Sequence, residues 1–477
     1  MSAASGTGAP AGARAPGRAH LIGIGGAGMA PVAELLAARG WQVSGSDARE
    51  SVALERLRTL GVDARAGHDA AHVPDGARVV VSTAVRPDNP ELVAARERGL
   101  DVLHRSEALA LVADGQDFVA VAGAHGKTTT SAMLAVALTD LGLDPSYAIG
   151  GKVLALGAGA HLGTGRAFVA EADESDGSFL AYSPALALVT NIEPDHLDHY
   201  GSRGAFEQAF RDFVARIVPG GTLVACADDA GALALVEDTA GAVRTVTYGT
   251  GPAPSPGREH VRLVGATSDG SSARAELVSG TGTVTLELAV GGLHNLRNAA
   301  GAWCAGVALG AEPAAMARAL GRFTGTGRRF EARGEAGGVR VVDDYAHHPT
   351  EVSATLRTAR LAAGQGRVLA LFQPHLYSRT RTFAAEFAQA LSAADVVVVT
   401  DVYAAREDPV PGVDSSLITD AMADHPDARV VGDRFDAARA VARRARPGDL
   451  VLTIGAGDVT ELGPVVLAEV AQDAQTP

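Results

Sequence analysis

A glycine-rich loop that contains a lysine is the segment of this sequence best suited to chemistry. Residues 123–130 read GAHGKTTT and follow an apolar run at residues 118–121. In such loops backbone N–H groups bind phosphate oxygens, a lysine neutralises the β- and γ-phosphates, and a hydroxyl binds Mg²⁺. Lys127 and Thr128 are the candidates for these side-chain roles. The loop is shorter than the general G-x-x-x-x-G-K-[ST] pattern, and a purely structural turn is the alternative. We expect it to bind ATP and to use it in a reaction.

The scarcity of lysine supports this interpretation. The chain has 41 lysines and arginines, of which only Lys127 and Lys152 are lysine. An ammonium and a guanidinium are not interchangeable at a phosphate site. A lysine inside a glycine loop is therefore expected to be there for its chemistry, whereas Lys152 could equally be structural.

A second glycine loop precedes the first one in the chain. Residues 23–28 read GIGGAG between a predicted strand and a predicted helix, and Asp47 ends the next strand. This G-x-G-x-x-G pattern places a nucleotide diphosphate on a helix N-terminus but does not identify the nucleotide. Taken alone, the loop also fits an NAD-dependent oxidoreductase or a tight structural turn.

Four polar segments each follow a predicted strand. They are EADESD at 171–176, TNIEPDHLDH at 190–199, DDYAHHPT at 343–350 and QPHLYSRTR at 373–381. Open α/β sheets bind ligands at the carboxyl ends of their strands, and carboxylates beside a phosphate loop suit Mg²⁺. We expect the last two segments to form a second half-site across an interdomain cleft. Solvated acidic turns and structural histidines are the alternatives.

These segments need a framework of parallel sheets to position them. Strands and helices alternate along the chain, which predicts an α/β protein with a Rossmann-like N-terminal domain, a P-loop-type central ATPase domain and a Rossmann-like C-terminal domain. A glycine-rich, β-like stretch is expected at residues 221–290. The expected divisions are a disordered tail at 1–18 and domains at 19–113, 114–332 and 333–477.

Composition excludes several classes of protein. The 477 residues are 47% hydrophobic, and no apolar stretch is long enough to predict a membrane span. The net charge of −14 argues against a nucleic-acid partner. Two distant cysteines, Cys226 and Cys304, predict reduced and buried thiols in a cytoplasmic protein.

Taken together, the motifs resemble those of the Mur ligase family, the ATP-dependent amide-forming ligases of peptidoglycan synthesis. The resemblance covers nearly the whole chain after the tail. The motifs occur in family order as GIGGAGM, GAHGKTTT, EADESD, NIEPDHLDHY, HNLRNAAGA, TGTGRRFE, DDYAHHPTE, FQPHLYSRT, DVYAARE and GAGDV. The segments DDYAHHP and FQPH are similar to those of the members that add L-alanine.

The resemblance implies a role for individual residues. The UDP part of the substrate would be held by Gly23, Gly25, Gly26, Ala27, Gly28, Asp47, Ser82 and Thr83. ATP would be held by Gly123, Ala124, His125, Gly126, Lys127, Thr128, Thr129, Asn295, Asn298, Arg329 and Asp344. Catalysis would depend on Lys127, Glu174, His196 and Arg329. Magnesium, with Mn²⁺ able to substitute, would be bound by Thr128, Glu174 and His196. The amino acid would be held by Tyr345, His347, His375 and Arg379.

The resemblance also implies the reaction. The lactyl carboxylate of UDP-N-acetylmuramate would attack ATP, and the amine of L-alanine would attack the resulting acyl phosphate. His196, His347 or a nearby carboxylate could accept the amine proton. Members that add later residues carry a carbamoylated lysine past the histidine motif, whereas residues 204–210 read GAFEQAF and contain none. This absence agrees with an L-alanine-adding member, acting as a monomer or homodimer.

Other functions remain open at this point. A recycling ligase that joins UDP-N-acetylmuramate to a whole tripeptide shares most of the motifs. An NAD-dependent oxidoreductase would leave Lys127 and the acidic cluster unexplained. A nucleotide-binding regulator without catalysis is disfavoured by the intact Lys127, Glu174, His196 and Arg329.

Overall fold

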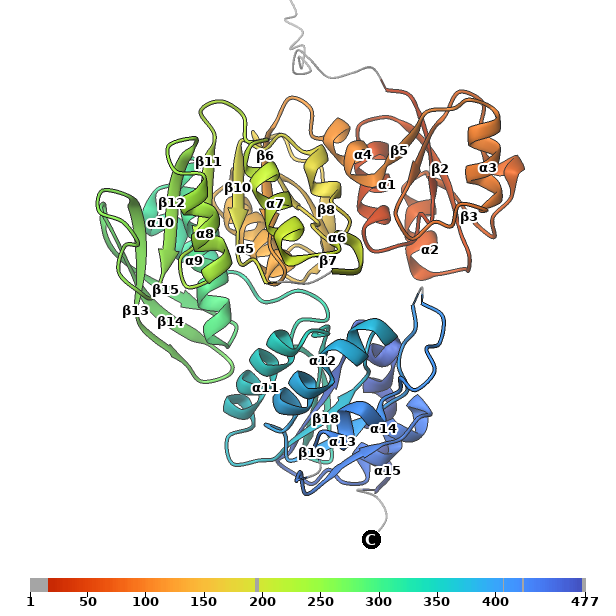
Figure 1. The fold of residues 1–477 in the computed structure, drawn as a ribbon, viewed down its shortest axis with the longest axis vertical. Coiled ribbons are helices and arrows are strands. Elements are labelled where there is room, and N and C mark those ends of the chain that lie inside the picture. The colour runs from red at the N-terminus through yellow and green to blue at the C-terminus, as the bar shows by residue number, and fades with distance from the viewer. Residues whose placement is uncertain (1–15, 194–196, 406, 423, 474–477) are drawn as a thin grey trace, which may run out of the picture. The chain divides into compact units, whose positions relative to one another are not determined.

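The computed structural model describes residues 16–193, 197–405, 407–422 and 424–473 (Figure 1). The chain divides into two compact units. The first contains the residues up to Val264 together with Glu276–Thr285 and Arg297–Arg322. The second contains Gly265–Ala275, Leu286–Leu296 and the residues from Phe323 onward.

The N-terminal sheet of the first unit is parallel, with strand order β3-β2-β1-β4-β5. Its strands are β1 (Arg18–Ile22), β2 (Gln42–Asp47), β3 (Asp63–Ala66), β4 (Arg78–Val81) and β5 (Val102–His104). Its helices are α1 (Met29–Ala38), α2 (Val52–Thr59), α3 (Pro90–Glu97) and α4 (Arg105–Val112). The strand order reverses between β1 and β4, which is where sheets of this kind bind nucleotides. This arrangement is the predicted Rossmann-like domain.

A buried carboxylate fixes the end of β2 in this sheet. Glu91 of α3 is fully buried and accepts a hydrogen bond from the hydroxyl of Ser46, which is also buried. Three imidazoles surround it: the nearest nitrogens of His72, His68 and His20 lie 3.2, 3.4 and 3.6 Å from its oxygens. Because a buried charge needs such partners, this cluster ties α3 to the strand end beside the first glycine loop.

The second sheet has ten strands in the order β15-β14-β13-β12-β11-β10-β6-β9-β7-β8. Its strands are β6 (Asp117–Ala122), β7 (Ser146–Val153), β8 (Ala158–His161), β9 (Ala167–Glu171), β10 (Leu186–Val189), β11 (Thr222–Cys226), β12 (Arg244–Gly249), β13 (Glu259–Ser268), β14 (Ala273–Ser279) and β15 (Gly282–Leu288). Its helices are α5 (Lys127–Asp140), α6 (Leu197–Tyr200), α7 (Arg203–Val214), α8 (Ala230–Asp238), α9 (Leu293–Ala308) and α10 (Pro313–Leu320). Strand β6 pairs in parallel with β10 and β9, so polar residues at these three strand ends lie together.

Helix α5 is the central helix of this domain. Its residues from Thr130 to Leu138 are all buried, and it packs against β7, β9 and α10. A helix that is apolar on every side belongs in a core. On β6, the buried side chains of Phe118, Ala120 and Ala122 belong to a core cluster that also contains α1 of the N-terminal domain. Burial along almost its whole length fixes α5 within the central domain.

One predicted segment needs correction. Residues 221–290 are not uniformly β, because α8 lies between β11 and β12. Asp229 caps this helix by accepting a hydrogen bond from Ala232 N, and Ala232, Leu235 and Val236 form its buried face. This spacing is helical, and the glycines that suggested strands lie outside the buried stripe.

The second unit contains a sheet with strand order β16-β17-β21-β18-β19-β20. Its strands are β16 (Glu331–Ala336), β17 (Val339–Asp344), β18 (Val368–Phe372), β19 (Val396–Val399), β20 (Ala428–Val430) and β21 (Leu450–Ile454). Its helices are α11 (Pro349–Ala363), α12 (Tyr377–Leu391), α13 (Ser416–Asp420), α14 (Arg434–Ala442) and α15 (Gly463–Asp473). Only β16 is antiparallel to its neighbour among the strand pairs described here.

Alternation along β18 shows why helices cover both faces of this sheet. Val368, Ala370 and Phe372 belong to the core that contains α11 and α12. Leu369 and Leu371 belong to the core that contains α14 and α15. Successive strand residues point to opposite faces, so a continuously apolar strand requires a helix layer on each side. The predicted α/β fold with three domains is confirmed.

Two further expectations concern the whole chain. Cys226 and Cys304 are both free and buried, as predicted. Among the described residues, no helix is long and apolar enough to cross a membrane.

Candidate active site

Two glycines shape the loop between β6 and α5. Gly123 has φ +132°, and a Cβ there would lie 2.2 Å from Thr190 Oγ1. Gly126 caps α5 in the left-handed conformation, and a Cβ there would lie 2.7 Å from Asn298 Oδ1. Both positions thus require glycine, because β10 and α9 approach the backbone closely. Asn298, a predicted ATP contact, lies directly against the loop. The side chain of Asn295, the other predicted contact on α9, donates a hydrogen bond to Gly291 O just before the helix begins.

The residues that follow β10 hold the loop in shape. The Asn191 side chain accepts a hydrogen bond from His125 N and donates one to His125 O, both at 2.9 Å. Thr190 Oγ1 donates to the same carbonyl at 2.6 Å. The His125 imidazole in turn lies 3.3 Å from the Glu193 carboxylate. Asn191 was included in the polar segment predicted to follow this strand, but no role of its own was assigned to it from sequence.

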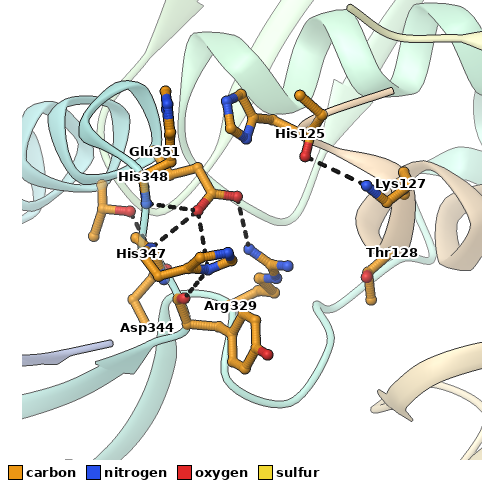
Figure 2. A network of polar contacts seen from close by, with 12 residues as sticks. His125, Lys127, Thr128, Arg329, Asp344, His347, His348 and Glu351 are labelled. Carbon is orange, nitrogen blue, oxygen red and sulfur yellow. Dashed lines mark hydrogen bonds and ion pairs between the residues drawn. The ribbon is translucent and has the colours of Figure 1, made fainter. Parts of the chain in front are cut away.

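Lys127 begins α5 and points back along the loop (Figure 2). Its ammonium donates to Gly123 O at 2.6 Å and to the two oxygens of Glu174 at 2.9 and 2.8 Å. Glu174 is almost completely buried. Burial lowers the pKa of Lys127, but the negative charges of Glu174 and Asp173 raise it above its usual value. Lys127 is therefore a permanent cation at the loop.

Thr128 contacts a different carboxylate. Its hydroxyl donates to Glu171 Oε2 at 2.7 Å, and Gly150 N donates to Glu171 Oε1 at 2.6 Å. A hydroxyl and a carboxylate oxygen side by side are hard oxygen ligands of the kind that Mg²⁺ prefers. The structure thus pairs Thr128 with Glu171, while the predicted ligand Glu174 pairs with Lys127. The predicted ligand His196 lies outside the described residues.

The first glycine loop lies at the reversal point of the N-terminal sheet. Gly25 N donates to Asp47 Oδ2 at 2.9 Å, and Ala48 N donates to Asp47 Oδ1 at 2.7 Å. Asp47 therefore shapes the loop through backbone N–H groups. Gly28 precedes α1 without any side-chain cap, which leaves the helix start open to an anion. Ser82, which is half-buried, and Thr83, which is exposed, follow the adjacent strand β4.

The second unit holds Arg329 in a strained turn. Arg328 and Phe330, on either side of it, have φ +59° and +50°. Phe330 N donates to Asp344 Oδ2 at 2.8 Å, and Tyr345 N donates to Arg328 O at 2.7 Å. Such backbone strain persists where surrounding contacts enforce it and is concentrated at functional sites. Arg329 also stacks on Tyr345, with Cζ 5.1 Å from the ring centroid.

Glu351 connects Arg329 to the histidine motif (Figure 2). Its carboxylate accepts hydrogen bonds from His347 N at 3.0 Å and His348 N at 3.3 Å. The Arg329 guanidinium lies 3.6 Å from the other oxygen. Sequence reasoning missed Glu351, although a glutamate at the third position of a helix that begins with Pro349 is a capping signal.

Asp344 is a buried member of this network. Its carboxylate accepts hydrogen bonds from Ala346 N at 2.8 Å and Thr355 Oγ1 at 3.1 Å, besides that from Phe330 N. Burial raises the pKa of Asp344 to about 6, although Arg329 and these hydrogen bonds oppose the increase. Both oxygens of Asp344, which the resemblance implied would hold ATP, are thus hydrogen-bonded within the protein itself.

The four predicted amino-acid ligands gather in the second unit. The ring of His347 lies 5.2 Å from Tyr345 and 6.0 Å from His375, measured between centroids. Arg379 Nη1 lies 3.5 Å from His375 Nδ1, and His375 stacks on Tyr403. Burial lowers the pKa of His347 to about 3, despite the opposing charge of Glu351. The cluster therefore offers a neutral imidazole and a guanidinium.

Known proteins match this arrangement over almost its entire length. The UDP-N-acetylmuramate–L-alanine ligase of Kineococcus radiotolerans is 58% identical over 463 residues, which cover 96% of this chain and 97% of the relative. The ligase of the same name from Streptomyces coelicolor is 50% identical over 457 residues, covering 95% and 98%. The chain belongs to the Mur ligase family. The family resemblance predicted from the motifs is confirmed.

The family models divide along the chain as the sheets do. The Mur ligase family catalytic domain matches residues 18–117, the Mur ligase middle domain 121–306, and the Mur ligase glutamate ligase domain 328–457. The crystal structure of the UDP-N-acetylmuramate-alanine ligase from Thermotoga maritima superposes with a TM-score of 0.80 at 29% identity, covering 96% of this chain and all of that one. A murein peptide ligase from Psychrobacter arcticus has a TM-score of 0.70 at 26% identity, covering 95% and 98%. Because the chain is a Mur ligase, the alternative interpretation of the first glycine loop as that of an NAD-dependent oxidoreductase is rejected.

Proposed function

We propose that this Mur ligase joins L-alanine to the lactyl carboxylate of UDP-N-acetylmuramate, the first amino-acid addition in peptidoglycan precursor synthesis. The observation that carries the proposal is 58% identity along almost the full length of a ligase with that name. The fold alone would not identify the substrate, since one fold hosts many reactions. The intact loop, carboxylates and amino-acid cluster supply the chemistry that such a ligase needs.

ATP provides the driving force for amide formation. A carboxylate is a poor electrophile. Transfer of the γ-phosphoryl group of ATP to the carboxylate oxygen releases ADP and gives an acyl phosphate, from which phosphate leaves readily when the amine attacks. Lys127, fixed by Gly123 O and Glu174, neutralises the phosphates as the two anions approach. Arg329 is the corresponding cation of the second unit, and its strained turn and Glu351 fix its direction.

Thr128 and Glu171 fit a divalent cation. Their oxygens are already in contact, and Gly150 N orients the carboxylate from its other side. Mg²⁺, or Mn²⁺ in its place, supplies charge neutralisation on the β- and γ-phosphates when bound. The role of Glu174 is then to hold Lys127 rather than the metal.

The amino acid is bound by the cluster around His347. The Arg379 guanidinium pairs with the L-alanine carboxylate. His347, whose pKa is about 3, stays neutral near pH 7 and accepts a hydrogen bond from the amine without repelling it. With so low a pKa it is a poor general base, so the amine proton goes to another acceptor. The substrates, ATP and a UDP-linked sugar, assign the reaction to the cytoplasm.

Phosphate release from ATP tests the proposal. The assay contains UDP-N-acetylmuramate, Mg²⁺ and one of L-alanine, glycine, L-serine or the tripeptide of a recycling ligase. We expect the largest stimulation with L-alanine, and mass spectrometry of the product should show an added alanine. Equal stimulation by glycine or L-serine would contradict strict L-alanine addition, and preference for the tripeptide would favour the recycling reaction.

A further inference from the structure

Arg105 occupies a position that its own helix does not explain. It is the first residue of α4, whose start is capped by His104 and Glu107. The Glu107 carboxylate accepts a hydrogen bond from His104 N at 2.7 Å. Acidic side chains are favoured in the first turn of a helix, whereas a cation there faces the positive end of the helix dipole. Another interaction must therefore account for this arginine.

The Arg105 guanidinium covers the last glycine of the first glycine loop. A Cβ on Gly28 would lie 2.5 Å from Arg105 Nη1, which is closer than any real contact. The guanidinium thus lies against the residue that opens α1, where no side chain caps the helix. Two positive features, a helix N-terminus and a cation, meet at one point of the loop. The nearby Asp47 carboxylate accepts hydrogen bonds from the backbone N–H groups of Gly25 and Ala48.

A carboxylate of the central domain holds the other side of Arg105. Arg105 Nη2 donates to Asp173 Oδ2 in the acidic segment that follows β9. Asp173 Oδ1 accepts from Ser175 N at 3.0 Å, so the carboxylate itself is fixed. The Asp173 carboxylate therefore fixes the Arg105 guanidinium at the first glycine loop from the central domain.

We propose that Arg105 binds the diphosphate of the nucleotide sugar, and that Asp173 holds its guanidinium over Gly28 for this purpose. A planar guanidinium with several N–H donors matches phosphate oxygens in pairs. Arg105 Nη2 donates to Asp173, whereas Arg105 Nη1 lies beside Gly28 at the start of α1, where an anion can bind. Arg105 is a substrate-binding residue that reads the diphosphate and not the base. The inference rests on the proposed function for the identity of the substrate.

Calorimetric binding of UDP and of uridine tests this assignment. In the Arg105→Met variant we expect the Kd for UDP to rise at least 30-fold, while the Kd for uridine, which lacks phosphates, changes less than threefold. Arg39→Met is the matched control. Arg39 also joins the N-terminal domain to the central one, through Gln116 Oε1 at 3.1 Å, but it lies at the far end of α1. It should leave both Kd values within threefold of the wild type.

Two further variants separate a binding role from a structural one. Gly28→Ala inserts a methyl group where the guanidinium lies, so it should also weaken the binding of UDP more than the binding of uridine. Arg105→Met could fail to fold because Asp173 loses its partner. The double variant Arg105→Met/Asp173→Asn removes the unpaired carboxylate charge, so the Kd values for UDP and uridine can still be compared. A UDP affinity within threefold of the wild type, or an equal loss for UDP and uridine, would overturn the inference. Failure of the wild-type protein to bind UDP would count against the proposed function instead.

Discussion

Replacing Glu171 with glutamine removes one negative charge beside Thr128 and keeps the size of the side chain. The amide oxygen can still accept from Gly150 N, and the amide NH₂ can donate to Thr128 Oγ1. Both hydrogen bonds of the carboxylate are therefore replaced, and the free energy of unfolding should change by less than about 1 kcal/mol. Any large effect on activity then reports on the lost charge.

The effect on metal binding follows from the geometry. A cation bound to the Thr128 hydroxyl would lie within about 4 Å of the Glu171 carboxylate, since these groups are in contact. At that separation and an effective dielectric constant of about 20, one pair of unit charges interacts by about 4 kcal/mol. Solvent screening of a half-buried carboxylate reduces this value, and we expect a net loss of about 3 kcal/mol. That corresponds to a roughly 100-fold increase in the Mg²⁺ concentration needed for half-maximal rate.

Initial rates at saturating ATP, measured against free Mg²⁺, provide the assay. Glu174→Gln is the matched control, because it removes a charge from the same acidic segment but from the partner of Lys127. The control should reduce the rate with a much smaller change in Mg²⁺ dependence. If the Mg²⁺ concentration for half-maximal rate in Glu171→Gln lies within threefold of the wild-type value, the reasoning is refuted. If that concentration rises 100-fold only in Glu174→Gln, Glu174 is the metal ligand, as the resemblance implied.

Three further changes test other parts of the chain. Lys127→Arg should fold normally but lose more than about 2 kcal/mol of transition-state stabilisation in kcat/KM for ATP, and near-normal turnover would argue against the role of the ammonium. Burial raises the pKa of Glu91, but the nearby His20 imidazole and the hydrogen bond from Ser46 bring it down to about 2. Because this is below the ordinary 4.5, Glu91 stabilises the fold by about 3 kcal/mol above pH 4.5, and this contribution disappears as the pH falls toward 2. Urea midpoints of Glu91→Gln should therefore depend less on pH between 5 and 3, and a profile parallel to the wild type would contradict the assignment. Glu351→Gln should lower kcat about tenfold, or about 1.4 kcal/mol, with an unchanged KM for the UDP-sugar, and an unaltered kcat would show that Arg329 is held by other contacts.

The sequence predicted the parts of the fold that depend on local pattern. Apolar runs followed by glycine or polar residues marked β1, β6, β17 and β18 correctly, because a parallel strand buried on both faces is continuously apolar. Helix α8 was missed because nearby glycines outweighed the spacing of its three buried residues. The antiparallel strand β16 was missed because most of its residues are exposed and lack an apolar run.

The sequence indicated which segments contribute to the candidate site, but it did not indicate which side chains within them contact each other. The acidic segment 171–176 was recognised, but the partner of each carboxylate depends on how the chain turns after β9. That turn brings Glu171 to Thr128 and Glu174 to Lys127. Arg105 gave no local signal, because its contacts are 68 residues away in Asp173 and at Gly28. Such pairings arise from tertiary structure and are absent from any short window of sequence.

The ion pair of Lys127 with Glu174 also affects which anions the loop can retain. Within the protein, the ammonium is already neutralised by a buried carboxylate. An entering anion must therefore compete with the chain for the lysine. ATP brings several charged oxygens to the loop at once, whereas inorganic phosphate brings a single group. We therefore expect inorganic phosphate to displace Glu174 from Lys127 less readily than ATP does, and so to be a weak inhibitor of the ligase.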